Sequence, residues 1–304
     1  NKIVLAKNPN YWMKGLPKLD SVVFRVITER AVQVQGLLAG QIDALEYLDA
    51  EDLPLLESNP DVVVTKRLSS LILVMAMNCS RPPLNDPRVR QAINYAVDKQ
   101  KVLDVAYGGG QPGSTFMDTG NAYYKDFTSL YPCNPDKARQ LLKEAGVTSD
   151  TVLTMYLPQN YDLHVKAGEL LQEMLSKVGL NVKIQLIDWS TWLSDVYRAS
   201  NFDFTVIGHT GKLDPDGTLG GYGEGRYVQW FNPQAADLIK KAASTGDFTA
   251  RKKLYDQVLQ IMATEVPFVY LGSSYQYVGL RKNVEGYRVT PNIDTFDFRW
   301  TELK

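Results

Sequence analysis

The chain has 304 residues, and its 33 Lys and Arg against 34 Asp and Glu give a formal net charge of −1. This balance excludes the clustered excess of cations that nucleic-acid and anionic-membrane binders carry. Hydrophobic residues make up 44% and charged residues 22%, as in ordinary globular proteins, and the length favours two lobes over one. Two His and two Cys make a four-ligand zinc site unexpected.

Neither a membrane span nor a signal peptide is predicted. No apolar run reaches the roughly 18–20 residues that a spanning helix needs. The opening NKIVLAKNPNYW lacks a basic region, a long apolar core and a small-residue cleavage site. The pair Cys79 and Cys133 leaves open one disulfide or two free thiols, and a disulfide would require an exported protein.

The first 79 residues alternate strand and helix patterns. Residues 21–27 form a β-branched apolar run, which predicts a strand. Thr28 suits the N-cap of a helix that ends at Gly40. A second short helix is predicted at 49–58, and strands at 62–66 and 70–77.

A new segment opens at Asn78. Asn85 or Asp86 caps a helix in which Pro87 occupies the first turn, where its missing N–H costs nothing. Five apolar residues then share one helical face: Val89, Ala92, Ile93, Ala96 and Val97. A long loop rich in aromatic residues follows at 114–133, and a further helix begins at Asn134.

Residues 152–207 follow a β-α-β-α-β order, which predicts an α/β layer with largely parallel pairing. The strands are predicted at 152–156, 181–187 and 202–207, and the helices at 162–178 and 190–199. A Gly-rich and aromatic-rich loop spans 208–232. The last elements predicted are helices at 233–243 and 248–264, a strand pair at 266–279 and an extended tail at 297–303.

No catalytic constellation emerges from the motifs, which favours a binding protein over an enzyme. The nucleophile-elbow pattern is absent, and GYGEGR at 221–226 neither follows a strand directly nor has the spacing of a dinucleotide fingerprint. Asp214 and Asp216 could act as an acid–base pair or as calcium ligands. The sequence DPDG is also a plain turn signal, and calcium needs six or more oxygens, so the turn is favoured. No cofactor or metal is predicted.

The loop 208–232 is the strongest candidate for a binding site. His209 lies just past the end of a predicted strand, where ligands of open α/β sheets bind. Loops this long inside a compact domain are usually functional, although its aromatic residues could equally cover the loop's own core. His164 lies inside a predicted helix and is expected at the surface or at the boundary of the core.

Several segments resemble the large solute-binding proteins of bacterial ABC importers in the dipeptide, oligopeptide and nickel group. They are IVLAKNPNYWMKGLPKLDSVVFRVI, GLLAGQIDAL, MNCSRPPLNDPRVRQAINYAVDKQKVLDVAYGGG, NPDKARQLLKEAG and EVPFVYLGSSYQYVGLRKNVEGYRVTP. The resemblance implies an α/β fold of the type II periplasmic-binding-protein kind, with two lobes of mixed sheets flanked by helices. It places residues 80–265 in one complete lobe, and residues 1–79 with 266–304 in a second lobe that lacks its N-terminal portion.

The resemblance also implies a ligand chemistry. Dipeptide binders read gly-trp-thr-gly-asp after the late strand, and the Asp pairs with the ligand's ammonium. Here Lys212 stands in that place, and no Arg lies at Gln159–Tyr161 to pair with a ligand carboxylate. A ligand with an anionic or hydroxyl-rich group facing Lys212 and Arg226 would fit better, such as a sugar, an opine-like conjugate or a modified peptide. An alignment gap could instead give Asp214 the acidic role.

By this resemblance the chain is the substrate-binding component of an ABC transporter. It would capture a peptide-like or other small polar solute between two lobes by hinge closure and deliver it to the membrane permease. The protein would be a monomer in the periplasm or a cell-surface lipoprotein. The alternatives are a cytosolic ligand-sensing regulator of the same fold, and a hydrolase that uses Asp214 or Asp216. The ligand-binding residues predicted are Gln159, Tyr161, His209, Thr210, Gly211, Lys212, Asp214, Tyr222, Arg226 and Trp230.

Overall fold

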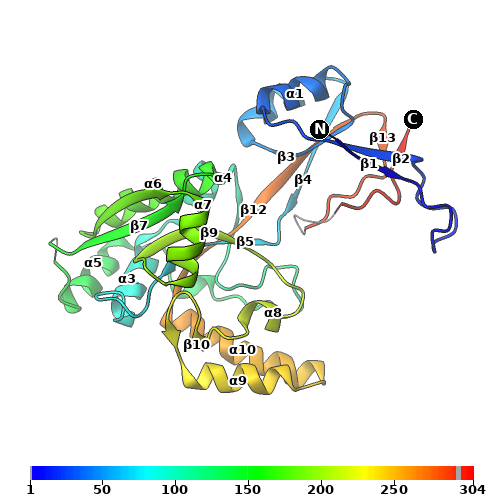
Figure 1. Ribbon diagram of the computed structural model, residues 1–304. Helices are drawn as coiled ribbons and strands as arrows, with labels where there is room; N and C mark the ends of the chain where they lie inside the picture. The colour runs from blue at the N-terminus through cyan, green and yellow to red at the C-terminus, as the bar shows by residue number, and fades with distance from the viewer. Residues whose placement is uncertain (1, 149, 292–295) are drawn as a thin grey trace. The chain divides into compact units, whose positions relative to one another are not determined.

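The computed structural model describes residues 2–148, 150–291 and 296–304 (Figure 1). The chain divides into two compact units, one of Asn1–Ser69 with Tyr275–Lys304 and one of Ser70–Ser274. The sequence predicted the division at 79/80 and 265/266. The difference arises because strand β5 (Leu71–Met77) pairs on one side with β9 and on the other with the first part of β12, and therefore joins the second unit.

The first unit is built from short strands around a small core. β1 (Lys2–Ala6) pairs antiparallel with β2 (Ser21–Arg25), and β3 (Ala44–Leu48) and β4 (Val62–Leu68) pair antiparallel with the second part of β12. The remaining elements are α1 (Arg30–Leu38), η1 (Ala50–Asp52), α2 (Leu53–Glu57), β13 (Val284–Glu285) and β14 (Glu302–Leu303). The buried apolar cluster consists of Val34, Leu37, Leu48, Leu56 and Val62.

The second unit is organised by a mixed sheet in the order β12-β5-β9-β7-β8. Its strands are β7 (Val152–Pro158), β8 (Asn181–Ile187), β9 (Phe204–Thr210) and β12 (Phe268–Arg281), with the short β6 (Gly110–Pro112) also paired to β12. β7 runs parallel to both β8 and β9, which confirms the parallel pairing that the β-α-β order predicts. β5 runs antiparallel to β9.

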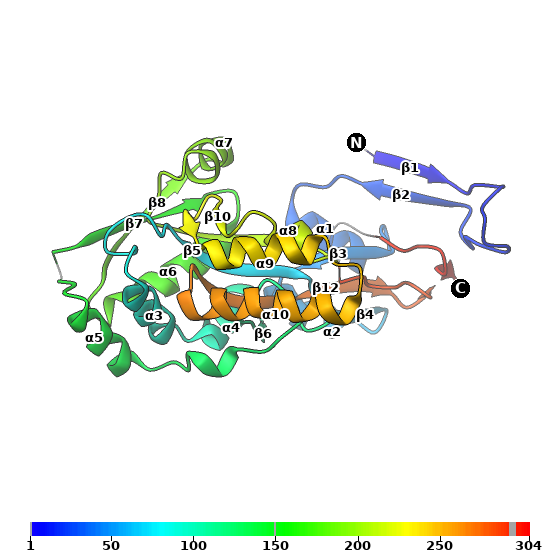
Figure 2. The same cartoon turned by 90° about the horizontal axis from the view of Figure 1, so that it is seen from below.

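Helices cover this sheet in two layers (Figures 1 and 2). One core packs under α3 (Pro87–Ala96), α4 (Lys99–Tyr107), α5 (Pro135–Glu144) and α6 (Asp162–Ser176). The other packs under α7 (Trp189–Thr191), the π-helical η3 (Trp192–Arg198), α9 (Pro233–Ala243) and α10 (Phe248–Glu265). The remaining short elements are η2 (Thr128–Leu130), α8 (Asp216–Leu219), β10 (Glu224–Gly225) and β11 (Trp230–Phe231).

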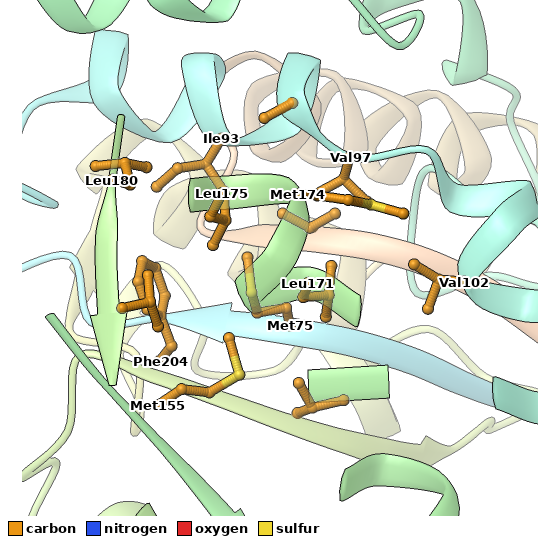
Figure 3. Packing of buried hydrophobic residues seen from close by; sticks show 14 of the residues in the cluster. Met75, Ile93, Val97, Val102, Met155, Leu171, Met174, Leu175, Leu180 and Phe204 are labelled. Atoms are coloured by element: carbon orange, nitrogen blue, oxygen red, sulfur yellow. The ribbon is translucent and has the colours of Figure 1, made fainter. Parts of the chain in front are cut away.

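The alternation of β5 side chains explains why the sheet has two cores. Three of them enter the first core: Leu73, Met75 and Met77. The intervening three enter the second core: Ile72, Val74 and Ala76. A strand buried on both faces reads as a continuous apolar run, as LILVMAM does here. Figure 3 shows Met75, Met155 and Phe204 of the sheet facing Leu171 and Leu175 of α6.

Three structural details correct the sequence predictions. Residues 268–281 form one long strand rather than a pair, because β12 continues through Gly272 and changes partner strands along its length. β9 extends to Thr210, so His209 lies on the strand and not beyond it. His164 is 8% exposed and belongs to the interior, where its Nδ1 lies 2.9 Å from the Tyr107 hydroxyl.

Candidate functional site

Three parallel strands of the second unit end at one edge of the sheet. The register pairs Met155 with Phe204 between β7 and β9, and Pro158 with Ile187 between β7 and β8. The segments that leave these strands are therefore neighbours: residues 159–161, 188–189 and 211–212. Ligands of open α/β sheets bind outside the carboxyl ends of the strands, so this edge is the candidate site.

His209 faces the aromatic core behind this edge. It shares a strand face with Ile207, a member of the second core, because side chains alternate along β9. Its Nε2 lies 2.8 Å from the Tyr227 hydroxyl, and the edge of its ring meets Phe116 at 5.4 Å between centroids. Burial, and then the nearby Arg226 cation, lower the pKa of His209 to about 4. The imidazole is therefore neutral at pH 7.

The loop that follows β9 is fixed by backbone contacts. The Gly211 N–H donates to the Ser70 carbonyl at 3.0 Å, and Thr210 pairs with Leu71 of β5. A Cβ on Gly211 would lie 2.5 Å from the Ser70 carbonyl oxygen, so only glycine allows this approach. The Asn121 amide donates to the Lys212 carbonyl at 3.0 Å. These contacts hold the backbone in place while the Lys212 side chain is exposed.

Gln159 and Tyr161 lie directly after β7 and are exposed. The Gln159 N–H donates to the Ile187 carbonyl at 2.9 Å, which joins this turn to the end of β8. The Tyr161 ring meets Trp189 edge to face, with centroids 5.4 Å apart and planes at 85°. The two rings form an aromatic corner at the edge where β9, the strand that precedes Lys212, also ends. Such a corner suits the flat or apolar part of a ligand.

Asp214 is not available as a free carboxylate. The Arg251 guanidinium of α10 donates to its two oxygens at 2.6 and 2.9 Å. The guanidinium holds the pKa of the Asp214 carboxyl below its usual range, so the group stays ionised and paired. The role of ammonium partner that an alignment shift would give Asp214 is thus opposed by a strong internal partner.

Three other predicted residues are held by contacts within the loop and with residues outside it. Tyr222 is 2% exposed and stacks on Phe116 at 5.2 Å. Arg226 lies over the Tyr222 ring at 4.7 Å and donates to the Thr218 carbonyl at 2.8 Å. Trp230 is 2% exposed, and its indole N–H donates to Glu265 at 2.6 Å. The structure therefore gathers Gln159, Tyr161, His209, Thr210, Gly211 and Lys212 at the edge. Tyr222 and Trp230 lie in the packing behind it, whereas Arg226 remains exposed.

Sequence reasoning missed the residues that support the edge. Asn121 and Arg251 come from a distant loop and a helix, 91 and 37 residues away from their partners. Tyr227 lies in the predicted loop, but no local sequence pattern indicates its hydrogen bond to His209. The sequence did contain one signal for Trp189, because this residue lies two positions after the end of β8 in the β-α-β order.

A separate cavity of about 530 Å³ lies in the first unit. Strands β1 and β2 beside it carry apolar side chains that are about half exposed or more, such as Ile3, Val4 and Val23. None of the predicted ligand residues lines the cavity. Its chemistry is apolar and aromatic with scattered polar groups, among them Glu46, whose carboxylate accepts from Gln276 at 2.7 Å.

Within the described ranges, no three or more His, Cys, Asp or Glu side chains converge as a metal site. Cys79 and Cys133 are both free thiols. In the same part of the chain, no helix combines the length and apolarity that crossing a bilayer requires.

Comparison with known proteins places the chain in a family. The model described as "Bacterial extracellular solute-binding proteins, family 5 Middle" matches residues 1–228, which is more than half of the sequence. The chain belongs to the family 5 bacterial extracellular solute-binding proteins. This confirms the resemblance found in the sequence. The proteins of this family and the similar proteins below are named as binding proteins rather than as enzymes.

Individual proteins agree with the family assignment. Di/tripeptide-binding protein 1 of Pseudomonas aeruginosa is 30% identical over 296 residues, which cover 93% of this chain and 55% of that protein. The chain thus spans about half the length of this curated relative. The putative peptide binding protein AppA of Clostridium difficile superposes with a TM-score of 0.91 at 22% identity, covering 100% of this chain and 65% of that one.

A further solved structure is AgaA from A.tumefacien R10 in complex with agropinic acid. It gives a TM-score of 0.79 at 25% identity and covers 100% of this chain and 64% of that chain. The α/β architecture with mixed sheets and flanking helices is thereby confirmed as the fold of periplasmic binding proteins.

Two histidines of the second unit, the buried His164 and the partly buried His209, make its stability depend on pH. Burial lowers the pKa of His164 and of His209 to about 4, against about 6.5 in an unfolded chain. Between these values the unfolded state binds more protons than the folded state. The stabilisation is therefore complete above pH 6.5 and is lost as the pH falls toward 4, by up to about 1.4 kcal/mol per pH unit for each histidine.

We expect the urea midpoint of the chain to fall between about pH 7 and about pH 5. His164→Gln and His209→Gln remove one titrating group each, so each variant should lose less stability over this interval than the parent chain. An unchanged pH dependence in both variants would contradict the assignment to these histidines.

Proposed function

We propose that this chain is part of the ligand-capturing component of an ABC importer, and that the edge formed by β7, β8 and β9 contacts the solute. The observation that carries the proposal is the convergence of exposed Gln159, Tyr161 and Lys212 where three parallel strands end. Membership of family 5, and relatives named as di/tripeptide-binding proteins, support the transport role. The same proposal has the protein act as a monomer outside the cytoplasm and deliver its ligand to a membrane permease.

We infer the charge of the ligand from the side chains at the edge. Lys212 is exposed and takes part in none of the ion pairs formed among the described residues, whereas Asp214 is occupied by Arg251. A cation there attracts a carboxylate or phosphate and repels an ammonium group. The proposed ligand is therefore a peptide-like or other small polar solute that presents an anionic or hydroxyl-rich group to Lys212.

A second ligand class has its own support. AgaA, at 25% identity, is titled as a complex with agropinic acid. An opine-like conjugate or a sugar would offer carboxylates or hydroxyls without requiring the free ammonium of a dipeptide. The aromatic corner of Tyr161 and Trp189 would pack against a flat or apolar part of such a ligand.

Ligand binding tests the proposal directly. A panel of peptides, N-acetylated peptides, oligosaccharides and opines should contain a compound that raises the melting temperature of the chain. Lys212→Glu replaces an attractive charge by a repulsive one. The affinity for an anionic member of the panel should fall by about tenfold or more, which corresponds to about 1.4 kcal/mol. Isothermal titration calorimetry measures the difference.

Lys183→Glu is the matched control, because Lys183 is an exposed lysine near the other end of β8. It makes the same change of net charge at a distance from the edge, and should leave the affinity within about twofold, since exposed charges are screened beyond about 10 Å. Equal losses in the two variants would show that net charge, not the position of Lys212, governs binding. No shift with any member of the panel would contradict the proposed function.

A further inference from the structure

Arg251 holds Asp214 in a bidentate ion pair beside the candidate ligand edge. Its Nη1 lies 2.6 Å from Asp214 Oδ2, and its Nη2 lies 2.9 Å from Oδ1. The Arg251 side chain is 14% exposed and that of Asp214 is 56% exposed. The loop thus brings its carboxylate to a cation that is already enclosed by the fold, which is the geometry of the stronger class of ion pair.

The guanidinium is fixed by other contacts as well. Its Nε donates to the Ala242 carbonyl at 3.0 Å, its Nη1 to the Tyr123 hydroxyl at 3.1 Å and its Nη2 to the Tyr255 hydroxyl at 3.4 Å. With the two bonds to Asp214, each of the five guanidinium N–H groups has an acceptor. The guanidinium also lies over the Tyr255 ring at 5.1 Å. Because Arg251 is held by helix contacts, Asp214 is the partner that is positioned.

This pairing decides which charge the loop displays. Lys212 and Arg251 supply two cations against two carboxylates, Asp214 and Asp216, and Asp216 receives a bond from the Tyr255 hydroxyl at 3.5 Å. The loop's other cation, the exposed Arg226, lies over the Tyr222 ring and donates to the Thr218 carbonyl. Without Arg251, Lys212 would be the one cation beside two carboxylates within residues 212–216. The Lys212 backbone is fixed separately by Asn121. Loss of Arg251 would therefore alter the charge of the loop more than its backbone conformation.

We propose that Arg251 is a specificity-determining residue: by neutralising and immobilising Asp214, it leaves the Lys212 ammonium as the charge that the loop presents to a solute. This inference rests on the proposed function and deepens it. A purely structural ion pair would affect stability alone. A specificity-determining pair changes the preference between ligands of opposite charge.

The test compares two probes on the complete 304-residue chain. N-acetyl-Ala-Ala carries one carboxylate, and Ala-Ala-amide carries one ammonium group. NMR titration gives the ratio of their affinities for the parent chain, which should favour the carboxylate probe. In Arg251→Gln the ratio should move about tenfold toward the ammonium probe, since an unpaired carboxylate then lies two residues from Lys212 in the same loop. In the double variant Arg251→Gln with Asp214→Asn, the ratio should return toward that of the parent.

Two further variants keep the test decisive. Asp214→Asn removes the carboxylate and leaves the Arg251 charge, so it should move the ratio in the opposite direction, even if Arg251→Gln does not fold. Arg139→Gln is the control, because Arg139 pairs with Asp136 at 2.5 Å on exposed α5, outside the loop and its anchors. It should leave the ratio unchanged.

The outcomes separate this inference from the proposed function. An unchanged ratio in both Arg251→Gln and Asp214→Asn, with binding retained, overturns the role of Arg251 and leaves the proposed function standing. The same shift in Arg139→Gln also overturns it, because the effect would then follow net charge alone. Failure of both probes to bind any variant contradicts the proposed function, and the inference falls with it.

Discussion

Replacing Phe268 by alanine should lower the free energy of unfolding of the second unit by about 3–5 kcal/mol, the usual cost of truncating a fully buried aromatic residue. Phe268 is completely buried at the start of β12. Its ring meets Phe116 at 4.9 Å and Tyr222 at 5.5 Å, both edge to face. The substitution loses the apolar contacts of the ring and leaves a cavity that the paired strands cannot close.

Urea unfolding followed by tryptophan fluorescence measures the effect, since Trp189, Trp192 and Trp230 all belong to the second unit. Phe231→Ala is the matched control, because Phe231 is 65% exposed on β11. It should cost less than about 1 kcal/mol, since a mostly exposed ring has little area to lose. Similar costs for the two substitutions would contradict a core centred on Phe268.

The helices could be predicted from the sequence because their signals are local. Val89, Ala92 and Ile93 fall on one helical face and are all completely buried under α3. The Asp86 side chain accepts from the Arg88 N–H as the predicted cap, and Pro87 follows it in the first turn. Periodicity and capping need only neighbouring residues, so one sequence suffices to find them.

The course of β12 could not be predicted for the opposite reason. Its residues pair with β5 and β6 in the first part and with β3 and β4 in the second part. A strand that changes partners reads like two strands, since the sequence records side-chain alternation but not which strand lies alongside. The register shifts between Tyr270 and Gly272, where the structure accommodates a bulge within one continuous strand.

The candidate site shows the same division. Lys212 and Tyr161 could be placed near strand ends, because the β-α-β order fixes which ends share an edge. The hydrogen bond of Trp230 to Glu265 and the pairing of Asp214 with Arg251 both depend on α10, a helix that packs against the loop from elsewhere in the chain. Such tertiary contacts decide whether a polar or aromatic residue in a loop faces a ligand or supports the fold.

Gly272→Ala should be among the most damaging single-methyl additions in the second unit. Gly272 has φ +129°, a region that L-residues rarely adopt. A Cβ there would lie 2.1 Å from the Gln111 carbonyl oxygen and 2.8 Å from the Pro112 Cα, both in β6. Backbone strain of about 1–3 kcal/mol and overpacking of about 1–3 kcal/mol add to a loss of about 2–6 kcal/mol.

The local pattern of hydrogen exchange separates this effect from general destabilisation. Because the added methyl group would push β6 away from β12, the amides of Gly110, Gln111 and Gly113 should lose protection first. Gly246→Ala is the control, since no heavy atom lies within 4 Å of its Cβ position and its φ lies outside the left-handed region. It should be neutral or slightly stabilising, because alanine restricts the unfolded chain. If Gly272→Ala were equally neutral, the close approach of β6 to β12 would be wrong.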